Sequence, residues 1–180
     1  METTRVFKTM KSPVGELKLV AGDQGLAAIL WKNDDPERVR LGPMVENDGH
    51  PILLETENQL NEYFAGRRKE FSVTLDFNGT EFQKAVWNAL LTIPYGETRS
   101  YGDIARQIGN PKAVRAVGAA NGRNPVSIIA PCHRVIGSNG KLTGFAGGLD
   151  AKSRLLKIEG IDASSDEGQF DLDFARSPDS

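Results

Sequence analysis

The hydrophobic pattern of this 180-residue chain changes its period at Asn78-Gly79, and this change limits the fold to two successive parts of different kinds. Before this point, short apolar runs bounded by turn residues occupy residues 5–31, and apolar and polar residues alternate over 71–77, as in half-buried strands. After it, apolar residues recur every three or four positions, as in helices packed against a core. The sequence therefore predicts an α/β fold class, with a small α/β domain over residues 1–78 and a mostly helical domain over residues 79–160.

The amino-terminal part predicts an antiparallel meander, a helix and one more strand. Pro51 suits the first turn of the helix, Leu53, Leu60 and Phe64 fall on one of its faces, and Gly66 ends it. We expect a mobile charged loop between the meander and this helix, with His50 as a loop residue. The strands are expected at residues 5–10, 16–21, 26–31 and 71–77, and the loop at 33–49.

The second part opens with two capping signals. Thr80 with Gln83, and Ser100 with Asp103, have the spacing of a capping box. The first helix has a core face of Phe82, Val86, Ala89, Leu90 and Ile93 and is expected to end at Pro94. A short helix over 101–108 and a third that starts at Asn110-Pro111 then predict a helix-turn-helix in a winged-helix-like domain.

The third helix has a basic outer face made of Lys112, Arg115, Ala119 and Arg123. Small residues, among them Ala116, allow close approach of a partner, although they also allow close packing against another helix. Residues 79–160 carry 11 basic and 5 acidic side chains, a net of +6, whereas residues 1–78 and 161–180 are net negative. This charge distribution favours an anionic partner such as nucleic acid, although an ordinary solvated basic face has the same composition.

Cys132 is the only cysteine, and it lies beside His133, one of two histidines. A single thiol in an apolar run is often a packing residue, but a neighbouring histidine and a carboxylate would raise the fraction of reactive thiolate. Glu159 is unusual in the last turn of a helix expected over 150–159, because its charge opposes the helix dipole. It therefore either faces solvent or has a cationic partner, for which His133 is the candidate.

The remaining features exclude several classes of protein. One cysteine and two distant histidines give no zinc spacing, so no metal is expected. The chain shows no leader and no apolar run of about 18 residues, so we expect a cytoplasmic, monomeric protein without membrane contact. Turns or loops are expected at 137–140 and 144–148, and a disordered acidic tail at 161–180.

The segment Pro131-Cys132-His133-Arg134-Val135 resembles the active-site motif of the O6-alkylguanine-DNA alkyltransferases, the methylated-DNA protein-cysteine methyltransferases. The resemblance is dense over residues 80–160 and loose before them. It implies direct, stoichiometric repair of duplex DNA that contains O6-alkylguanine, with no cofactor. Further matching segments are residues 109–120, 124–126, 147–149 and 155–160.

The resemblance also implies a role for each matching residue. Cys132 attacks the alkyl carbon, His133 deprotonates the thiol through a water, and Glu159 orients the imidazole. Tyr101 helps to turn the nucleotide out of the helix and donates to the base, and Asn124 is the hinge between recognition helix and active site. Arg115 fills the gap left in the base stack, with the helix-turn-helix in the minor groove. The implied substrate-binding residues are the backbone of Cys132, Val135 and Ala146 together with Lys152, Phe145 and Ser127.

Departures from the family pattern are few: Ala146 replaces a serine of some members, Phe145 a tyrosine, and Ser127 a proline. Two other functions compete with alkyl transfer. A non-catalytic lesion-binding protein of the alkyltransferase-like kind lacks the cysteine, which Cys132 argues against. A Cys-His hydrolase needs a cleft and an oxyanion hole, and it turns over.

Overall fold

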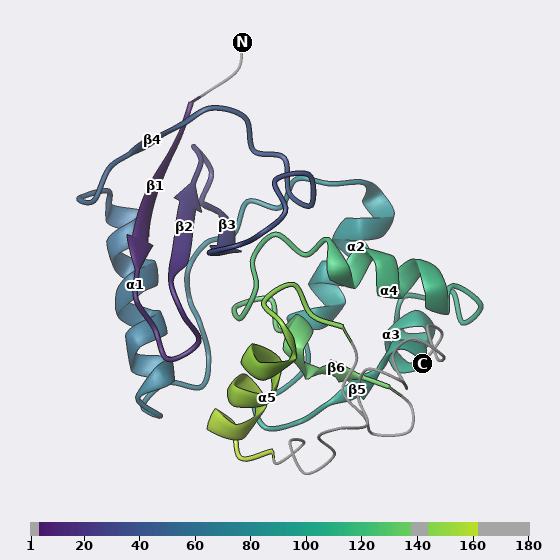
Figure 1. The fold of residues 1–180 in the computed structure, drawn as a ribbon. Coiled ribbons are helices and arrows are strands. Elements are labelled where there is room, and N and C mark those ends of the chain that lie inside the picture. The colour runs from purple at the N-terminus through teal and green to yellow at the C-terminus, as the bar shows by residue number, and fades with distance from the viewer. Residues whose placement is uncertain (1–3, 138–143, 162–180) are drawn as a thin grey trace. The chain divides into compact units, whose positions relative to one another are not determined.

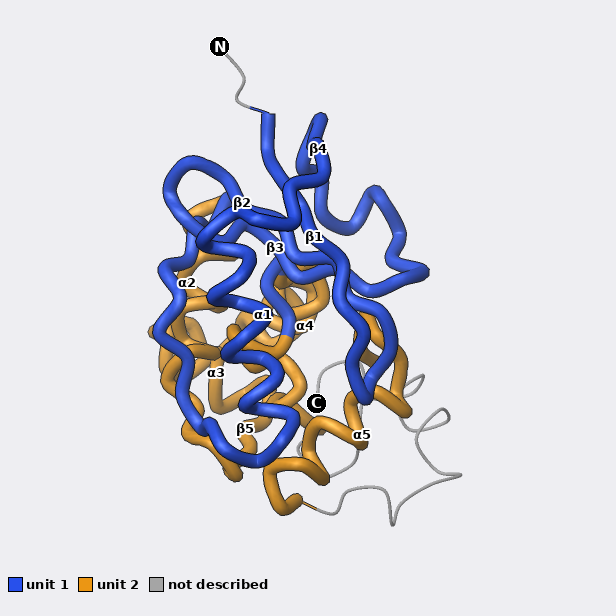
Figure 2. Tube along the Cα trace, turned by 90° about the vertical axis from the view of Figure 1, so that its left-hand side faces the viewer, with its two compact units in different colours: residues 1–78, 125–127 blue, residues 79–124, 128–180 orange. Residues whose placement is uncertain are grey.

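The computed structural model describes residues 4–137 and 144–161. The chain forms two compact units (Figure 2), an amino-terminal unit of Met1–Asn78 with Pro125–Ser127 and a carboxy-terminal unit of Gly79–Asn124 with Ile128–Ser180. The residues Pro125–Ser127 belong to the first unit, although the sequence predicted one boundary at Asn78-Gly79 with everything after it in the second domain. The expected turn at 137–140 lies largely outside the described residues, and so does nearly all of the expected tail.

The amino-terminal unit contains a four-stranded sheet in the order β3-β2-β1-β4 (Figure 1). The three strands of the predicted meander are confirmed to within one residue, and they pair antiparallel. The expected charged loop contains a short fourth strand, which the sequence did not predict and which pairs parallel with β1 at the edge of the antiparallel meander. Three residues are too few to show an alternating pattern in the sequence. The strands are β1 (Arg5–Met10), β2 (Leu17–Ala21), β3 (Leu26–Trp31) and β4 (Met44–Glu46).

Helix α1 (Pro51–Phe64) packs against this sheet. His50 is its N-cap rather than a simple loop residue, because its Nδ1 accepts a hydrogen bond from the amide of Ile52 at 3.2 Å. Leu53 and Leu60 are buried as predicted, but Tyr63 rather than Phe64 completes the buried face.

The predicted strand at 71–77 was wrong as a regular element. The segment forms one isolated bridge to β3, in which Leu26 donates to the Thr74 carbonyl and accepts from the Asp76 amide, both at 2.8 Å. Further along β3, the amide of Ile29 donates to the Pro125 carbonyl at 2.9 Å. Two separate segments therefore cover the outer edge of β3, and neither is long enough to add a strand.

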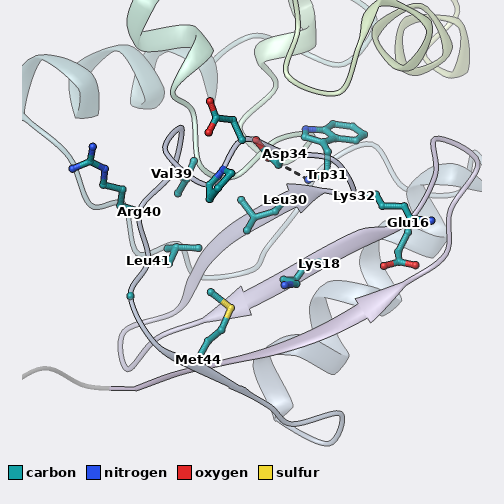
Figure 3. Close-up of a pocket in the computed structure, with 13 residues that line it drawn as sticks. Glu16, Lys18, Leu30, Trp31, Lys32, Asp34, Val39, Arg40, Leu41 and Met44 are labelled. Carbon is teal, nitrogen blue, oxygen red and sulfur yellow. Dashed lines mark hydrogen bonds between the residues drawn. The ribbon is translucent and has the colours of Figure 1, made fainter.

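A cavity of about 500 Å³ lies between the sheet and the loop that follows β3 (Figure 3). Leu30, Val39, Leu41 and Met44 line it together with charged side chains, and Asp34 accepts from the Trp31 amide at 3.3 Å at its rim. Its lining contains neither cysteine nor histidine, so it offers no nucleophile.

The carboxy-terminal unit is mostly helical. Both predicted capping boxes are present, at Thr80 and Ser100. The first helix ends before the predicted stop at Pro94, and Ile93 follows it in a turn. The third helix starts later than predicted, because the Ala113 amide donates to the Asn110 carbonyl and closes a turn first. The elements are α2 (Glu81–Leu90), β5 (Arg99–Ser100), α3 (Tyr101–Gln107), α4 (Val114–Gly122), η1 (Cys132–Arg134), β6 (Val135–Ile136) and α5 (Leu149–Ile158).

Close packing ties α4 to the helices before it. The indole of Trp87 in α2 donates to the Ala120 carbonyl of α4 at 2.8 Å. A Cβ at Gly79 would lie 2.6 Å from the same indole, so only glycine fits there. A Cβ at Gly118 of α4 would lie 3.9 Å from the ring of Tyr101 in α3. The inward small residues of α4 thus serve the packing of the helix-turn-helix. No helix in the described part of the chain is long and apolar enough to span a bilayer.

Candidate functional site

Cys132 lies at the start of the single 3₁₀ turn η1, within a buried segment. Its side chain is 4% exposed, and its amide donates to the Ala130 carbonyl at 2.7 Å. The neighbouring His133 is fully buried, and the same turn closes when the Arg134 amide donates to the Pro131 carbonyl at 2.9 Å. The chain has no second cysteine and so no intrachain disulfide, and the backbone hydrogen bonds of this turn fix the position of Cys132.

The structure brings His133 and Glu159 together, as the sequence suggested. The imidazole Nε2 lies 2.7 Å from Oε2 of Glu159, which is the C-cap residue of α5. Since a carboxylate only accepts, Nε2 carries the proton, and Nδ1 is left as the acceptor. Nδ1 is buried and has no hydrogen-bond partner among the described residues. The site therefore contains a proton acceptor, Nδ1 of His133, on the residue that follows the thiol of Cys132.

Arg134 is the residue that sequence reasoning missed. Its Nε donates to Oε1 of Glu159 at 2.8 Å and its Nη2 to Oε2 at 3.1 Å. The Gly96 amide adds a further hydrogen bond to Oε1 at 3.2 Å. These donors explain how a carboxylate is tolerated at the end of α5, where the helix dipole opposes it. The signal in the sequence was the misplaced Glu159 itself, which needed more than one cationic partner.

Burial lowers the pKa of His133 below its ordinary value, and this effect outweighs the contact with Glu159, which raises it. The charges of Arg134 and Lys152 lower it further. An imidazole with a pKa below 6.5 is neutral at pH 7, which is the form of a general base.

Lys152 of α5 is fully buried, and its Nζ donates to the Val135 carbonyl at 2.7 Å. Burial lowers its pKa from 10.5 to about 8, although the thiol of Cys132 raises it. A lysine with this pKa is mostly an ammonium at pH 7, and its charge favours a thiolate at Cys132.

A buried hydrogen bond within the segment between α4 and Cys132 fixes its conformation. The side-chain amide of Asn124 donates to the Ala130 carbonyl at 2.8 Å. Within this loop, Ile128 has a φ of +77°, a strained conformation for a β-branched residue. Such strain persists only where the surroundings impose it, which indicates that the backbone leading to Cys132 has a fixed conformation without a ligand.

The predicted DNA-contacting residues of the outer face are exposed, on α4 or close to one of its ends. These are Lys112, Arg115, Ala116, Ala119 and Arg123. Tyr101, by contrast, is buried as the first residue of α3. On the opposite side of α4, Val117 is buried.

The predicted substrate-binding residues are divided between the two compact units. Phe145 is half-buried and Ala146 exposed, in the turn before α5. Ser127 belongs to the amino-terminal unit, where its hydroxyl accepts from the indole of Trp31 at 3.2 Å. In the described part of the chain, no group of three or more histidine, cysteine, aspartate or glutamate side chains could hold a metal ion.

Comparison with known proteins connects this geometry to a family. Residues 81–161 match the DNA-binding domain of 6-O-methylguanine DNA methyltransferase, and residues 6–77 match its ribonuclease-like domain. A methylated-DNA–protein-cysteine methyltransferase of Methanosarcina acetivorans is 53% identical over 154 residues, which are 86% of this chain and 97% of that protein. A protein of the same name from Mycobacterium tuberculosis is 50% identical over 167 residues, which are 92% of this chain and 98% of that protein.

Solved structures agree. The structure of Mycobacterium tuberculosis OGT in complex with DNA superposes with a TM-score of 0.79 at 50% identity, over 86% of this chain and 92% of that one. The structure of the O6-methylguanine methyltransferase of the same organism superposes with a TM-score of 0.78 at 49% identity, over 89% and 95%. Both family domains are thus matched in the order in which they occur along this chain, and the chain belongs to the 6-O-methylguanine DNA methyltransferase family.

Proposed function

We propose that this protein repairs alkylated DNA by transferring the methyl group of O6-methylguanine to Sγ of Cys132. The observation that carries the proposal is the buried set of Cys132, His133 and Glu159, in which His133 keeps a neutral acceptor nitrogen. The near full-length similarity to proteins named methylated-DNA–protein-cysteine methyltransferase supports the same reaction. Residues 79–160 carry both DNA binding and chemistry in this proposal. A single reduced thiol is suited to the cytoplasm.

The transfer is a displacement at carbon. The thiol proton passes through a water to Nδ1 of His133, while Glu159 holds the Nε2 proton and stabilises the imidazolium that forms. The sulfur–carbon bond forms as the carbon–O6 bond breaks, and the bonding electrons stay on the guanine. A proton donated to the departing base, a role we assign to Tyr101, completes the charge balance. The product is a thioether, so each protein molecule reacts once.

Recognition of DNA is assigned to the helix-turn-helix of α3 and α4. Arg115 lies on the exposed face of α4 with Ala116 and Ala119 beside it, and Arg123 follows as the C-cap residue; the small alanine side chains allow the helix backbone to come close to the duplex. Arg115 fills the space of the flipped guanine in the base stack, and Asn124 connects α4 to the reactive segment. Contacts of the arginine with the base stack then offset part of the free energy of unstacking.

The guanine edge is read by backbone groups of Cys132, Val135 and Ala146. The Val135 carbonyl already accepts from Lys152 at 2.7 Å, and its second lone pair is available to the exocyclic amine of the base. Lys152 therefore fixes the direction of the reading group without replacing it.

Intact-mass and peptide-mass spectrometry after incubation with an O6-methylguanine duplex test the proposal. We expect one added methyl group per protein, located on Cys132, and restored guanine in the DNA. Cys132→Ser is the matched control and should bind the duplex but gain no mass. An unmodified Cys132 with bound duplex would indicate a lesion-binding protein instead, and multiple turnovers on an ester or peptide would indicate a hydrolase.

A further inference from the structure

The guanidinium of Arg134 forms hydrogen bonds with two different parts of the carboxy-terminal unit. Two of its nitrogens hold the Glu159 carboxylate, at 2.8 and 3.1 Å. Its Nη1 donates to the carbonyl of Ile93, in the turn after α2, at 2.6 Å. The centre of the Tyr95 ring lies 5.8 Å from Cζ of Arg134, and Arg134 is only 6% exposed. The fork is therefore immobile and leaves Glu159 little freedom to rotate.

Arg134 and His133 share one oxygen of this carboxylate. Oε2 of Glu159 accepts from His133 Nε2 at 2.7 Å and from Arg134 Nη2 at 3.1 Å. The orientation of the Glu159 carboxylate toward the imidazole thus depends on Arg134, and so does the net charge next to the imidazole.

We propose that Arg134 is a positioning residue for alkyl transfer, which fixes Glu159 as a carboxylate in the orientation that keeps His133 neutral with Nδ1 free to accept the thiol proton. This inference rests on the proposed function and adds a residue to it. Two of the three hydrogen bonds described above for Arg134 go to Glu159, and in this proposal the arginine acts through that carboxylate.

Removal of the arginine charge has a defined direction. The charged or titratable groups around His133 are Glu159, which raises its pKa, and Arg134 and Lys152, which lower it. Cys132 interacts with Lys152, and Tyr95 lies beside Arg134 and Glu159. Without Arg134, Glu159 faces the imidazole with less compensation, and the histidine–carboxylate pair takes up a proton at higher pH. A doubly protonated imidazole has no acceptor nitrogen.

Two variants separate charge from geometry. Arg134→Gln removes the charge, whereas Arg134→Lys keeps the charge but lacks the planar fork. Arg40→Gln is the matched control, because Arg40 forms an exposed ion pair with Glu37 in the other unit. The chain has only two histidines, and His50→Asn assigns their signals while retaining a capping side chain.

The first measurement is nitrogen-15 NMR of the imidazoles against pH. We expect the parent and Arg40→Gln to show His133 as the neutral Nε2–H tautomer at pH 7. In Arg134→Gln the His133 midpoint should rise by about one pH unit or more, and Arg134→Lys should restore it. A midpoint and tautomer unchanged in Arg134→Gln would overturn the proposal.

The second measurement is the single-turnover rate of methyl transfer at saturating duplex. In Arg134→Gln the acid limb of the pH–rate profile should move to higher pH, and the rate at pH 7 should fall about tenfold or more, with unchanged affinity for DNA. Arg134→Lys should keep the position of the limb but react more slowly at every pH. If Arg134→Gln does not fold, a lysine variant as fast as the parent overturns the proposal by itself.

The two hypotheses fail in different ways. If the parent transfers no methyl group, the proposed function is wrong, while the titration of His133 still tests the effect of Arg134 on its tautomer. If the parent reacts but the midpoint and tautomer of His133 are the same with and without Arg134, only the proposed role of the arginine is wrong.

Discussion

Glu159 is the side chain on which the buried polar groups of the site converge. It accepts from His133, from two nitrogens of Arg134 and from the Gly96 amide. Because Glu159, His133 and Arg134 are all buried, we expect the loss of the carboxylate charge to affect both the stability of the carboxy-terminal unit and the imidazole next to Cys132.

Glu159→Gln is expected to lower the free energy of unfolding by about 3–5 kcal/mol, because it leaves the buried Arg134 without its counter-charge. It should also lower the pKa of His133 further and slow methyl transfer, since the carboxylate no longer favours the imidazolium. Urea unfolding and single-turnover kinetics measure the two effects. Glu37→Gln, which breaks an exposed ion pair, is the control, and equal stability of the two variants would contradict the burial argument.

Lys152 makes the stability depend on pH in the alkaline range. Its pKa is about 8 in the folded protein and 10.5 in the unfolded chain, so between these values the unfolded state binds more protons. Stability from this group therefore rises from pH 8 to 10.5, and its cost below pH 8 is on the order of 3 kcal/mol.

Lys152→Met should abolish this rise. We expect the unfolding free energy of the variant minus that of the parent to decrease as the pH increases from 8 to 10.5. Urea midpoints at three pH values give the difference, and Lys157→Met, on the exposed side of the same helix, should show no such trend. A difference that is constant with pH would mean that Lys152 is not buried as an ammonium.

The sequence singled out Cys132, His133 and Glu159 because each is unusual for its position, and the structure brings His133 and Glu159 together. The sequence did not predict Arg134, since an arginine after a histidine gives no local sign of where its guanidinium goes. That position depends on how α5 and the end of α2 meet η1, which are contacts between residues far apart in the chain.

At the scale of elements, the capping boxes at Thr80 and Ser100 were predictable because their hydrogen bonds join residues three apart. The start of α4 was not, because a turn at Asn110 competes with helix initiation. The segment over 71–77 alternates in burial only as far as residue 75, and whether such a segment joins a sheet depends on the free edge it meets.

Gly79 joins the first turn of α2 to the packing of Trp87. A Cβ there would lie 2.6–2.8 Å from the indole ring and from Oε1 of Gln83, so Gly79→Ala should destabilise the protein by about 1–3 kcal/mol. Gly122→Ala is the control, because no atom lies within 4 Å of its added Cβ and alanine favours a helix. Thermal unfolding of both variants tests this, and a Gly79→Ala protein as stable as the control would show that Trp87 can move.

At the scale of the whole molecule, charge is distributed unevenly along the chain. Residues 162–180 carry six acidic side chains and one basic side chain, so a chain that ends at Ile161 has a formal net charge of +3 instead of −2. Long-range repulsion of DNA by this segment would slow association.

A chain truncated after Ile161 should therefore bind duplex DNA faster at low salt, with the difference disappearing above about 0.5 M salt, where charges are screened. Stopped-flow fluorescence at several salt concentrations measures the association rate. A tail variant with the six acidic residues changed to their amides should behave like the truncated chain, and a gain that persists at high salt would point to something other than charge.

The return of Pro125–Ser127 to the amino-terminal unit bears on any attempt to dissect this protein into gene fragments. A fragment that stops at Asn78 lacks the carbonyl that the Ile29 amide uses, and a fragment that begins at Gly79 carries the buried Val126 without its bridge to Ile29. Domain swaps with relatives therefore need three junctions within this chain, after residues 78, 124 and 127, so that the tripeptide is exchanged together with residues 1–78.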